Sequence, residues 1–188
     1  LKPALDACTR CPIGGCASQA VAGCGPANSA LMIVGEQPGD LEDLKGLPLI
    51  GPAGAVLDGA LQRAGLTRTD AYLTNAVKHF KFKPRGRRRI HDRASRDEML
   101  QCKWWLDFER EQIKPKLHLA LGATAAFALT LNPAPLADRR GTVEETPDGA
   151  PVLITYHPAY LLRLPDAHAK ARAEALFEED LARASSLL

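Results

Sequence analysis

Short apolar runs alternate with amphipathic segments along this chain, and this alternation indicates its fold. Continuous apolar runs bounded by turn-forming residues are typical of strands buried on both faces, and they predict strands at 30–34, 71–77, 116–122 and 151–156. Apolar residues three and four apart predict helices at 52–64, 95–112, 123–131 and 166–184. Strands that alternate with helices in this way predict an α/β fold, a three-layer α/β/α domain with a central, mostly parallel sheet.

Several local signals set the boundaries of these elements. Pro52 suits the first turn of a helix, and the Ser95 to Glu98 spacing is that of a capping box. The stretch 41–51 reads as a long loop, and 139–143 reads as a short edge strand. We expect one domain over 1–188, with a cysteine-rich arm at 1–29 and a basic loop at 78–94.

Polar side chains follow three of the predicted strands. Glu36, Gln37 and Asp40 come after the first strand, Asn75 ends the second, and His157 follows the last. Because ligands of open α/β sheets bind outside the carboxyl ends of the strands, we expect these residues to share one site. Each also has a structural interpretation, since Glu36 could cap a turn, Asn75 could bind loop backbone, and His157 with Pro158 could end a strand.

A concentrated basic segment follows Asn75. Between Lys78 and Arg93 there are eight Lys or Arg and one acid, Asp92, so the segment carries +7 in a chain whose net charge is only +2. Such a cluster indicates phosphate binding, although a charge run is more often a solvated surface. Two imidazoles, His79 and His91, flank it.

The five cysteines point to a metal centre. They lie at 8, 11, 16, 24 and 102, and the Cys8 to Cys11 pair has the Cys-x-x-Cys spacing that lets two thiolates reach one metal or cluster. An odd count without a secretory signal argues against a disulfide framework, and no strand precedes the pair as in thioredoxin-like motifs. We therefore expect a reducing, cytoplasmic environment.

The expected helix at 95–112 connects this centre to the core. It carries Cys102 and two adjacent tryptophans, Trp104 and Trp105, which cannot share one helix face. We expect one of them in the core and the other over the cysteine arm.

Overall composition excludes other classes of protein. The chain is 46% hydrophobic and 24% charged, which suits a globular domain with a sizeable core. No apolar run approaches the roughly 20 residues of a membrane-spanning helix, and no signal peptide opens the chain, so we expect a soluble protein without a membrane partner. The first residue is Leu1 rather than Met, so we expect that the true start is missing or that the chain is part of a longer protein.

Four ordered motifs together resemble the uracil-DNA glycosylase superfamily. The segments at 35–43 and 157–163 resemble the first and second motifs of its iron-sulfur members, and 46–54 and 74–78 resemble the segments between them. The Glu36-Gln-Pro-Gly-Asp40 form and the insertion Arg87-Arg-Arg-Ile-His91 resemble the UdgX branch. This resemblance implies that the protein excises uracil and then stays covalently attached to the abasic sugar.

The resemblance also implies roles for individual residues. His91 is the nucleophile that captures C1′, Glu36 orients or activates it, and Asp40 positions a water or the base. Asn75 reads the uracil edge, His157 stabilises the departing uracil oxygen, and the backbone at Gln37 and Gly39 holds the base. Leu49 stands where members of the family usually have a stacking Phe. Contacts to the DNA backbone are implied for Arg87, Arg88, Arg89 and Arg163.

The implied cofactor is a [4Fe-4S] cluster. Ordinary iron-sulfur members use four Cys, and this sequence has His79 at the third position, so the implied ligands are Cys8, Cys11, His79 and Cys102. The same donor set also suits structural zinc, and Cys16 or Cys24 could replace His79.

Three hypotheses follow, in order of preference. The first is a monomeric, single-turnover glycosylase that acts on uracil-containing DNA, single strands included, and traps the product through His91. The second is an ordinary turnover uracil-DNA glycosylase in which His91 contacts phosphate. The third is a non-catalytic module that binds damaged DNA.

Overall fold

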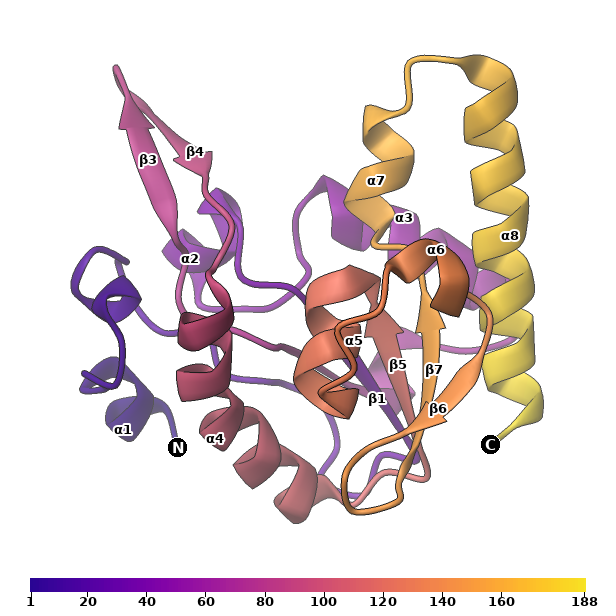
Figure 1. The fold of residues 1–188 in the computed structure, drawn as a ribbon, viewed down its shortest axis with the longest axis horizontal. Helices are drawn as coiled ribbons and strands as arrows, with labels where there is room; N and C mark the ends of the chain where they lie inside the picture. The colour runs from indigo at the N-terminus through magenta and orange to yellow at the C-terminus, as the bar shows by residue number, and fades with distance from the viewer.

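A five-stranded sheet organises the molecule. In this computed structural model, which describes residues 1–188, the strand order is β2-β1-β5-β7-β6 (Figure 1). The strands are β1 (Leu31–Gly35), β2 (Ala71–Asn75), β5 (Leu117–Leu121), β6 (Val143–Glu145) and β7 (Pro151–Thr155). All neighbouring pairs are parallel except β6 with β7, so the predicted mostly parallel sheet is confirmed.

Helices cover both faces of this sheet. On one side lie α3 (Pro52–Arg63), α7 (Pro158–Arg163) and α8 (Ala167–Ser186), and on the other lie α4 (Arg96–Ile113), α5 (Gly122–Thr130) and α6 (Leu136–Arg139). Alternate residues of β1 point to opposite faces, because the side-chain period of a strand is two. Leu31 and Ile33 join the core under α3 and α8, whereas Met32 and Val34 join the core under α4 and α5.

The amino-terminal arm packs on the first turns of α4. It contains α1 (Lys2–Asp6) and the 3-10 turn η1 (Pro12–Gly15), and it contributes Leu5 and Ile13 to a third core cluster. Trp105 is buried in that cluster and its Nε1 donates to Cys8 Sγ at 3.2 Å. Trp104 is exposed, and the Arg10 guanidinium of the arm lies over its ring. Both tryptophans therefore contact the arm.

Some segments differ from the sequence predictions. The stretch 41–51, expected to be a loop, contains the short helix α2 (Asp40–Lys45), and 157–163 contains α7. The basic segment forms an antiparallel hairpin, β3 (Phe82–Arg85) with β4 (Arg88–His91), that rises from the carboxyl edge of the sheet (Figure 1). The edge strand expected at 139–143 begins only at Val143, because α6 extends to Arg139 and a turn follows it at 140–141. A second 3-10 turn, η2 (Arg68–Asp70), leads into β2. None of the helices combines the length and apolarity of a membrane span.

Candidate active site

The parallel pairing of β1 and β2 brings two predicted site segments together. Gly35 is paired with Asn75 at the ends of these strands, and Val77 N–H donates to the Glu36 carbonyl at 3.0 Å. Position 35 has no room for a side chain, because a Cβ there would lie 2.3 Å from Asn75 Oδ1. Glycine at position 35 thus lets the Asn75 amide lie against the end of β1.

Three buried polar atoms at this edge lack a hydrogen-bond partner within the protein. They are Glu36 Oε1, Gln37 Oε1 and Asn75 Oδ1, and no other buried side-chain oxygen or nitrogen of residues 1–188 is unpaired. An unpaired buried polar atom costs free energy, so in native proteins such atoms are few and are usually satisfied by an ordered water, an ion or a ligand. The three unpaired atoms therefore mark the end of β1 and β2 as a binding site.

Surrounding side chains hold the loops of this site in place. Glu42 accepts from the backbone N–H of Gly39 at 3.0 Å and of Gly51 at 2.9 Å, which joins two of the motif segments. Leu49 is buried with a positive φ of 54°, and its Cδ2 would lie 3.5 Å from a Cβ at Gly35. Leu49 and the Asn75 amide thus both lie against Gly35, so an apolar side chain stands near the unpaired amide oxygen.

The hairpin places His91 opposite Glu36. His91 ends β4, and its Nε2 lies 3.8 Å from Glu36 Oε1. The base of the hairpin is fixed by Gln37, whose Nε2 donates to the carbonyls of Lys81 at 3.0 Å and Asp92 at 3.1 Å. Residues more than fifty positions apart in the sequence therefore form one acid and imidazole pair.

His157 faces the same site from the end of β7. Its Nδ1 accepts from the Ala159 N–H at 3.1 Å as the N-cap of α7, so the neutral ring carries its proton on Nε2. Burial, with smaller effects of Arg163 and His91, lowers the pKa of His157 to about 4. His157 is thus a neutral hydrogen-bond donor near neutral pH.

Arg89 differs from the other arginines of the hairpin. Its Nε donates to Asp40 Oδ1 at 2.5 Å, its Nη1 donates to Asp43 Oδ2 at 2.5 Å, and its guanidinium lies over the rings of Phe80 and Phe82. Arg89 was expected to contact DNA, and Asp40 was expected to position a water or the base. In this structure the two side chains are paired with each other.

Asp43 extends this pairing to the cysteine arm. It is fully buried and also accepts from Ser18 N–H at 3.0 Å. Neither Asp43 nor Glu42 was expected in the site, although both lie inside the first motif.

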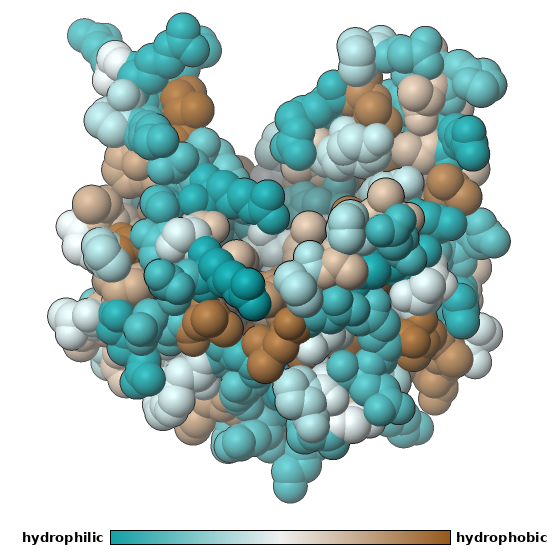
Figure 2. Space-filling model, viewed as in Figure 1, coloured by the Kyte–Doolittle hydropathy of each residue, from teal (hydrophilic) through white to brown (hydrophobic).

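Arg87, Arg88 and Arg163 are exposed, as DNA contacts require. Figure 2 shows a cleft that opens between the raised hairpin and the end of the molecule formed by α7 and α8, and its visible walls are largely hydrophilic. The arginines of the hairpin and Arg163 of α7 belong to the elements on either side of this cleft.

The predicted cluster ligands lie in one region of the fold. Cys8 and Cys11 pack against the core cluster that contains Cys102, and a Cβ at Gly14 would lie 2.9 Å from the Cys8 carbonyl oxygen and 3.6 Å from the His79 ring. Cys102 Sγ accepts from Lys78 N–H at 3.2 Å, and burial raises the pKa of its thiol to about 11. No group of three or more His, Cys, Asp or Glu side chains in residues 1–188 is arranged to hold a metal ion.

The two alternative ligands lie elsewhere in the arm. Cys16 is exposed. Cys24 exchanges backbone hydrogen bonds with Leu73 at the outer edge of β2.

A buried ion pair connects the cysteine region to the active site. Lys78 Nζ donates to Glu109 Oε2 at 2.6 Å, to Thr74 Oγ1 at 2.7 Å and to the Asn75 carbonyl at 2.8 Å. Glu109 also accepts from Gly23 N–H at 2.8 Å. Sequence reasoning missed this pair, because Lys78 reads as part of the basic segment and Glu109 as an ordinary helix surface residue.

Comparison with known proteins identifies the family. Residues 22–182 match the family model described as the uracil DNA glycosylase superfamily. The chain belongs to this superfamily. The observed α/β fold agrees with that assignment.

Several curated relatives of this superfamily are named type-4 uracil-DNA glycosylase. The protein of Thermotoga maritima is 34% identical over 157 residues, which cover 83% of this chain and 78% of the relative. The protein of Pyrobaculum aerophilum is 35% identical over 189 residues, which cover 97% of this chain and 90% of the relative. The protein of Archaeoglobus fulgidus is 32% identical over 168 residues, covering 86% and 81%.

Proposed function

We propose that this chain is a uracil-DNA glycosylase of the UdgX type, which releases uracil and then captures the abasic sugar through His91. The observation that carries the proposal is the approach of His91 Nε2 to Glu36 Oε1, 3.8 Å apart, at the edge where Asn75 and Gln37 have unpaired oxygens. The family and the names of the relatives support the glycosylase activity. The hairpin that carries His91 supports the capture step.

Base recognition falls to Asn75. Uracil presents an N3–H donor next to the O4 acceptor, and the Asn75 amide offers the complementary acceptor and donor. Its Oδ1 is buried and unpaired, so uracil would satisfy it. Leu49 supplies an apolar contact to the ring, and the backbone at Gln37 and Gly39 lines the other side.

Cleavage breaks the bond between uracil N1 and C1′, and its electron pair leaves with the uracil. Negative charge then develops on the uracil O2, and His157 Nε2–H stabilises it by hydrogen bonding. Because the pKa of His157 is about 4, the ring is neutral near pH 7, and it acts as a donor rather than as a general acid. The sugar is left as an oxocarbenium ion.

Capture follows at the same carbon. Glu36 accepts the N–H proton of one ring nitrogen of His91, and the lone pair of the other ring nitrogen attacks C1′. A neutral imidazole held next to the cation reacts ahead of water because of its high effective concentration. Asp40 contributes indirectly, since its pairing with Arg89 holds the hairpin in position.

DNA is bound without reading its sequence. Arg87, Arg88 and Arg163 are exposed on either side of the cleft, where they suit contacts to phosphates (Figure 2). The reacting nucleotide must be extrahelical, so single-stranded DNA is an accepted substrate of the monomer.

An iron-sulfur cluster held by Cys8, Cys11, His79 and Cys102 completes the proposal. A cubane cluster spaces its ligands more widely than a single ion does, so it suits donors that gather in one region without converging on one point. The cluster would supply a structural crosslink between the arm, the base of the hairpin and α4. Elemental analysis of the purified protein should find iron and not zinc, and His79→Ala should lower the iron content.

The decisive experiment is an adduct gel. Protein is incubated with a single-stranded oligonucleotide that contains one uracil, and then denatured and resolved by electrophoresis. Wild type should give a denaturation-resistant band of higher mass, and His91→Ala should give none while still releasing uracil. Recovery of only free protein and cleaved product from the wild type would refute covalent capture.

An ordinary turnover glycosylase is the second candidate. It is favoured by the relatives, which are named type-4 uracil-DNA glycosylase. Many uracils released per protein, with no adduct, would support it. Tight binding without any uracil release would instead indicate a non-catalytic damage-binding module.

A further inference from the structure

A small cavity lies beside the candidate active site. Its volume is about 160 Å³, and it lies between the first turns of α4, the first turns of α5 and the segment 132–134. Met99, Phe127, Pro133 and Ala134 form much of its wall. This volume is close to the roughly 150 Å³ of an enclosed protein cavity that holds benzene, so it is of the order that one small planar ring needs.

The cavity is positively charged. Arg93 and Arg96 line it, both are exposed, and no carboxylate is among the lining residues. Neither arginine takes part in a salt bridge of residues 1–188. The Arg96 guanidinium lies 4.9 Å from the centre of the Phe127 ring. A guanidinium that lies over a buried aromatic ring and has no carboxylate partner offers its outer face for stacking on a base of a single-stranded nucleic acid.

The position of the cavity fits the DNA strand that enters the site. Arg93 follows His91 by only two residues, a span of about 7 Å at most in an extended chain. On the other side, Ala123 follows Gly122, where a Cβ would lie 3.0 Å from the His157 Cβ. Two residues of the wall, Arg93 and Ala123, therefore lie close in the chain to the proposed nucleophile and to the residue that packs on the proposed uracil-oxygen donor.

We propose that this cavity binds the base of the nucleotide adjacent to the excised uracil on the same strand. The inference rests on the proposed function, and it adds a second subsite to it. The base would stack on the outer face of the Arg96 guanidinium, which lies over the Phe127 ring, and Arg93 would contact the phosphate between the two nucleotides.

Recognition at this subsite depends on the face of the base and not on its edge. The one amide in the wall, Asn132, is already engaged: its Nδ2 donates to Glu144 at 3.2 Å, and its Oδ1 accepts from Ala134 N–H at 3.0 Å. Every base has an aromatic face, so the subsite should bind any neighbouring base. Only a strand that lacks a base at this position should bind more weakly.

The test uses single-stranded oligonucleotides with one uracil and a tetrahydrofuran abasic analogue at the position before or after it. Single-turnover uracil release and the binding of matching oligonucleotides with uncleavable 2′-fluoro-2′-deoxyuridine are both measured. Loss of the neighbouring base should weaken binding and slow release by about tenfold on one side of the uracil, and by less than twofold on the other.

Two variants and a control connect this effect to the cavity. Arg96→Ala removes the stacking cation and Ala134→Trp fills the cavity from its rim, and in both the penalty for the missing base should fall below twofold. Arg172→Ala removes an exposed, unpaired arginine of α8 and should keep the full penalty.

The outcomes separate this inference from the proposed function. Equal binding and release with and without either neighbouring base, or a penalty that survives both variants, would overturn the subsite. Absence of uracil release from every substrate would instead overturn the glycosylase, and the binding penalty would still decide whether the cavity holds a base.

Discussion

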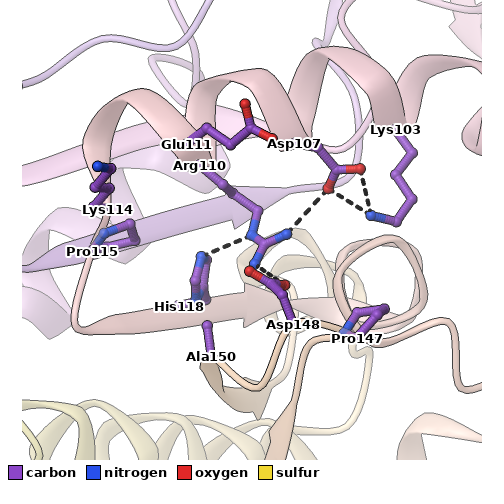
Figure 3. Close-up of a pocket in the computed structure, with 10 residues that line it drawn as sticks. All are labelled: Lys103, Asp107, Arg110, Glu111, Lys114, Pro115, His118, Pro147, Asp148 and Ala150. Carbon is purple, nitrogen blue, oxygen red and sulfur yellow. Dashed lines mark hydrogen bonds and ion pairs between the residues drawn. The ribbon is translucent and has the colours of Figure 1, made fainter.

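A charged hollow and the candidate active site lie at opposite edges of the central sheet. At the amino ends of β5 and β7, a hollow of about 630 Å³ is lined by charged residues that bind one another (Figure 3). Arg110 donates to Asp107 at 3.2 Å, to Asp148 at 2.7 Å and to His118 at 3.1 Å. At the carboxyl edge, Glu36, Gln37 and Asn75 each keep an unpaired buried oxygen. Unsatisfied polar atoms, and not volume, distinguish the reactive edge from the inert one.

Each edge also holds one histidine, His118 at the amino edge and His157 at the carboxyl edge. Their pKa values are lowered alike, but their hydrogen bonds differ. Burial lowers the pKa of both His118 and His157 to about 4. His118 uses both ring nitrogens within the protein, since Nε2 accepts from Arg110 and Nδ1 donates to the Pro151 carbonyl at 3.1 Å. His157 uses only Nδ1. A shifted pKa alone therefore does not identify the functional imidazole.

The largest expected effect separates these two histidines. His157→Ala should slow uracil release about 10²- to 10³-fold, because it removes the donor to the developing oxyanion. His118→Ala should leave the release rate of the folded protein unchanged. Single-turnover kinetics on a uracil oligonucleotide measure both, and equal losses in the two variants would break the comparison.

Acidification should lower the stability of the folded protein, because burial lowers the pKa of both His118 and His157. Because both folded pKa values lie below the ordinary 6.5, only the unfolded chain gains these protons between pH 6.5 and pH 4, so stability is full above pH 6.5 and falls as the pH drops through this window. The buried His118 alone should contribute a loss of about 3 kcal/mol. Urea unfolding at pH 7 and pH 4.5 measures this loss. In His118→Gln the pH dependence should be shallower, and an unchanged slope would contradict the assignment.

Each edge of the sheet also has one arginine that is paired with aspartates, Arg89 at the carboxyl edge and Arg110 at the amino edge. Arg89 and Arg110 each bind two aspartates, but only Arg89 holds a fully buried one. Arg89→Ala leaves the Asp43 carboxylate buried without its charged partner and should cost about 3 kcal/mol of stability. The partners of Arg110, Asp107 and Asp148, reach solvent, so the loss of their ion pairs in Arg110→Ala should cost only about 1 kcal/mol. Only Arg89→Ala should also slow adduct formation, by about tenfold, since only Arg89 holds the hairpin that carries His91. Quantified adduct gels give this rate. Arg88→Ala, which changes an exposed neighbour, should form the adduct at nearly the wild-type rate at low salt.

The smallest expected effect concerns salt. Replacing Arg87 and Arg88 with Ala should reduce the slope of log affinity against log salt concentration by about 1.4 for single-stranded DNA. Replacing Lys103 and Lys114, which line the hollow at the opposite edge, should leave the slope unchanged. Fluorescence anisotropy at several salt concentrations measures both slopes.

Regular elements of this fold could be predicted because they bury apolar side chains with a clear period. The β1 segment alternates between two cores, and the Ser95 and Glu98 capping box forms as expected, with Glu98 N–H donating to Ser95 Oγ at 3.2 Å. The β3–β4 hairpin has no such signal, since its side chains are mostly exposed and Pro84 is unusual inside a strand. The short helix α2 was missed because the glycine-bearing turn before it reads as a loop.

Within the site, the sequence placed residues at strand ends but could not show how they pair. The shared position of Glu36 and Asn75 follows from parallel strands, which the pattern predicts. The Arg89 contacts to Asp40 and Asp43 join residues 46 or more positions apart, and every charge in such a segment looks equally available to DNA. Tertiary structure alone distinguishes the arginine that braces the hairpin from its neighbours that face solvent.

The closed base of the hairpin has a consequence for how this protein could arise. Asp92 N–H donates to the Lys81 carbonyl at 3.0 Å, and Gln37 Nε2 bonds to the carbonyls of both residues, so the two ends of the hairpin meet where it leaves the domain. A segment whose ends meet can be inserted or deleted in one genetic event without separating the strands on either side. His91, the proposed trapping residue, thus lies on a segment that one insertion can add or one deletion can remove. If the proposed capture holds, a single insertion would suffice to turn a renewable enzyme into one that is consumed by its own product.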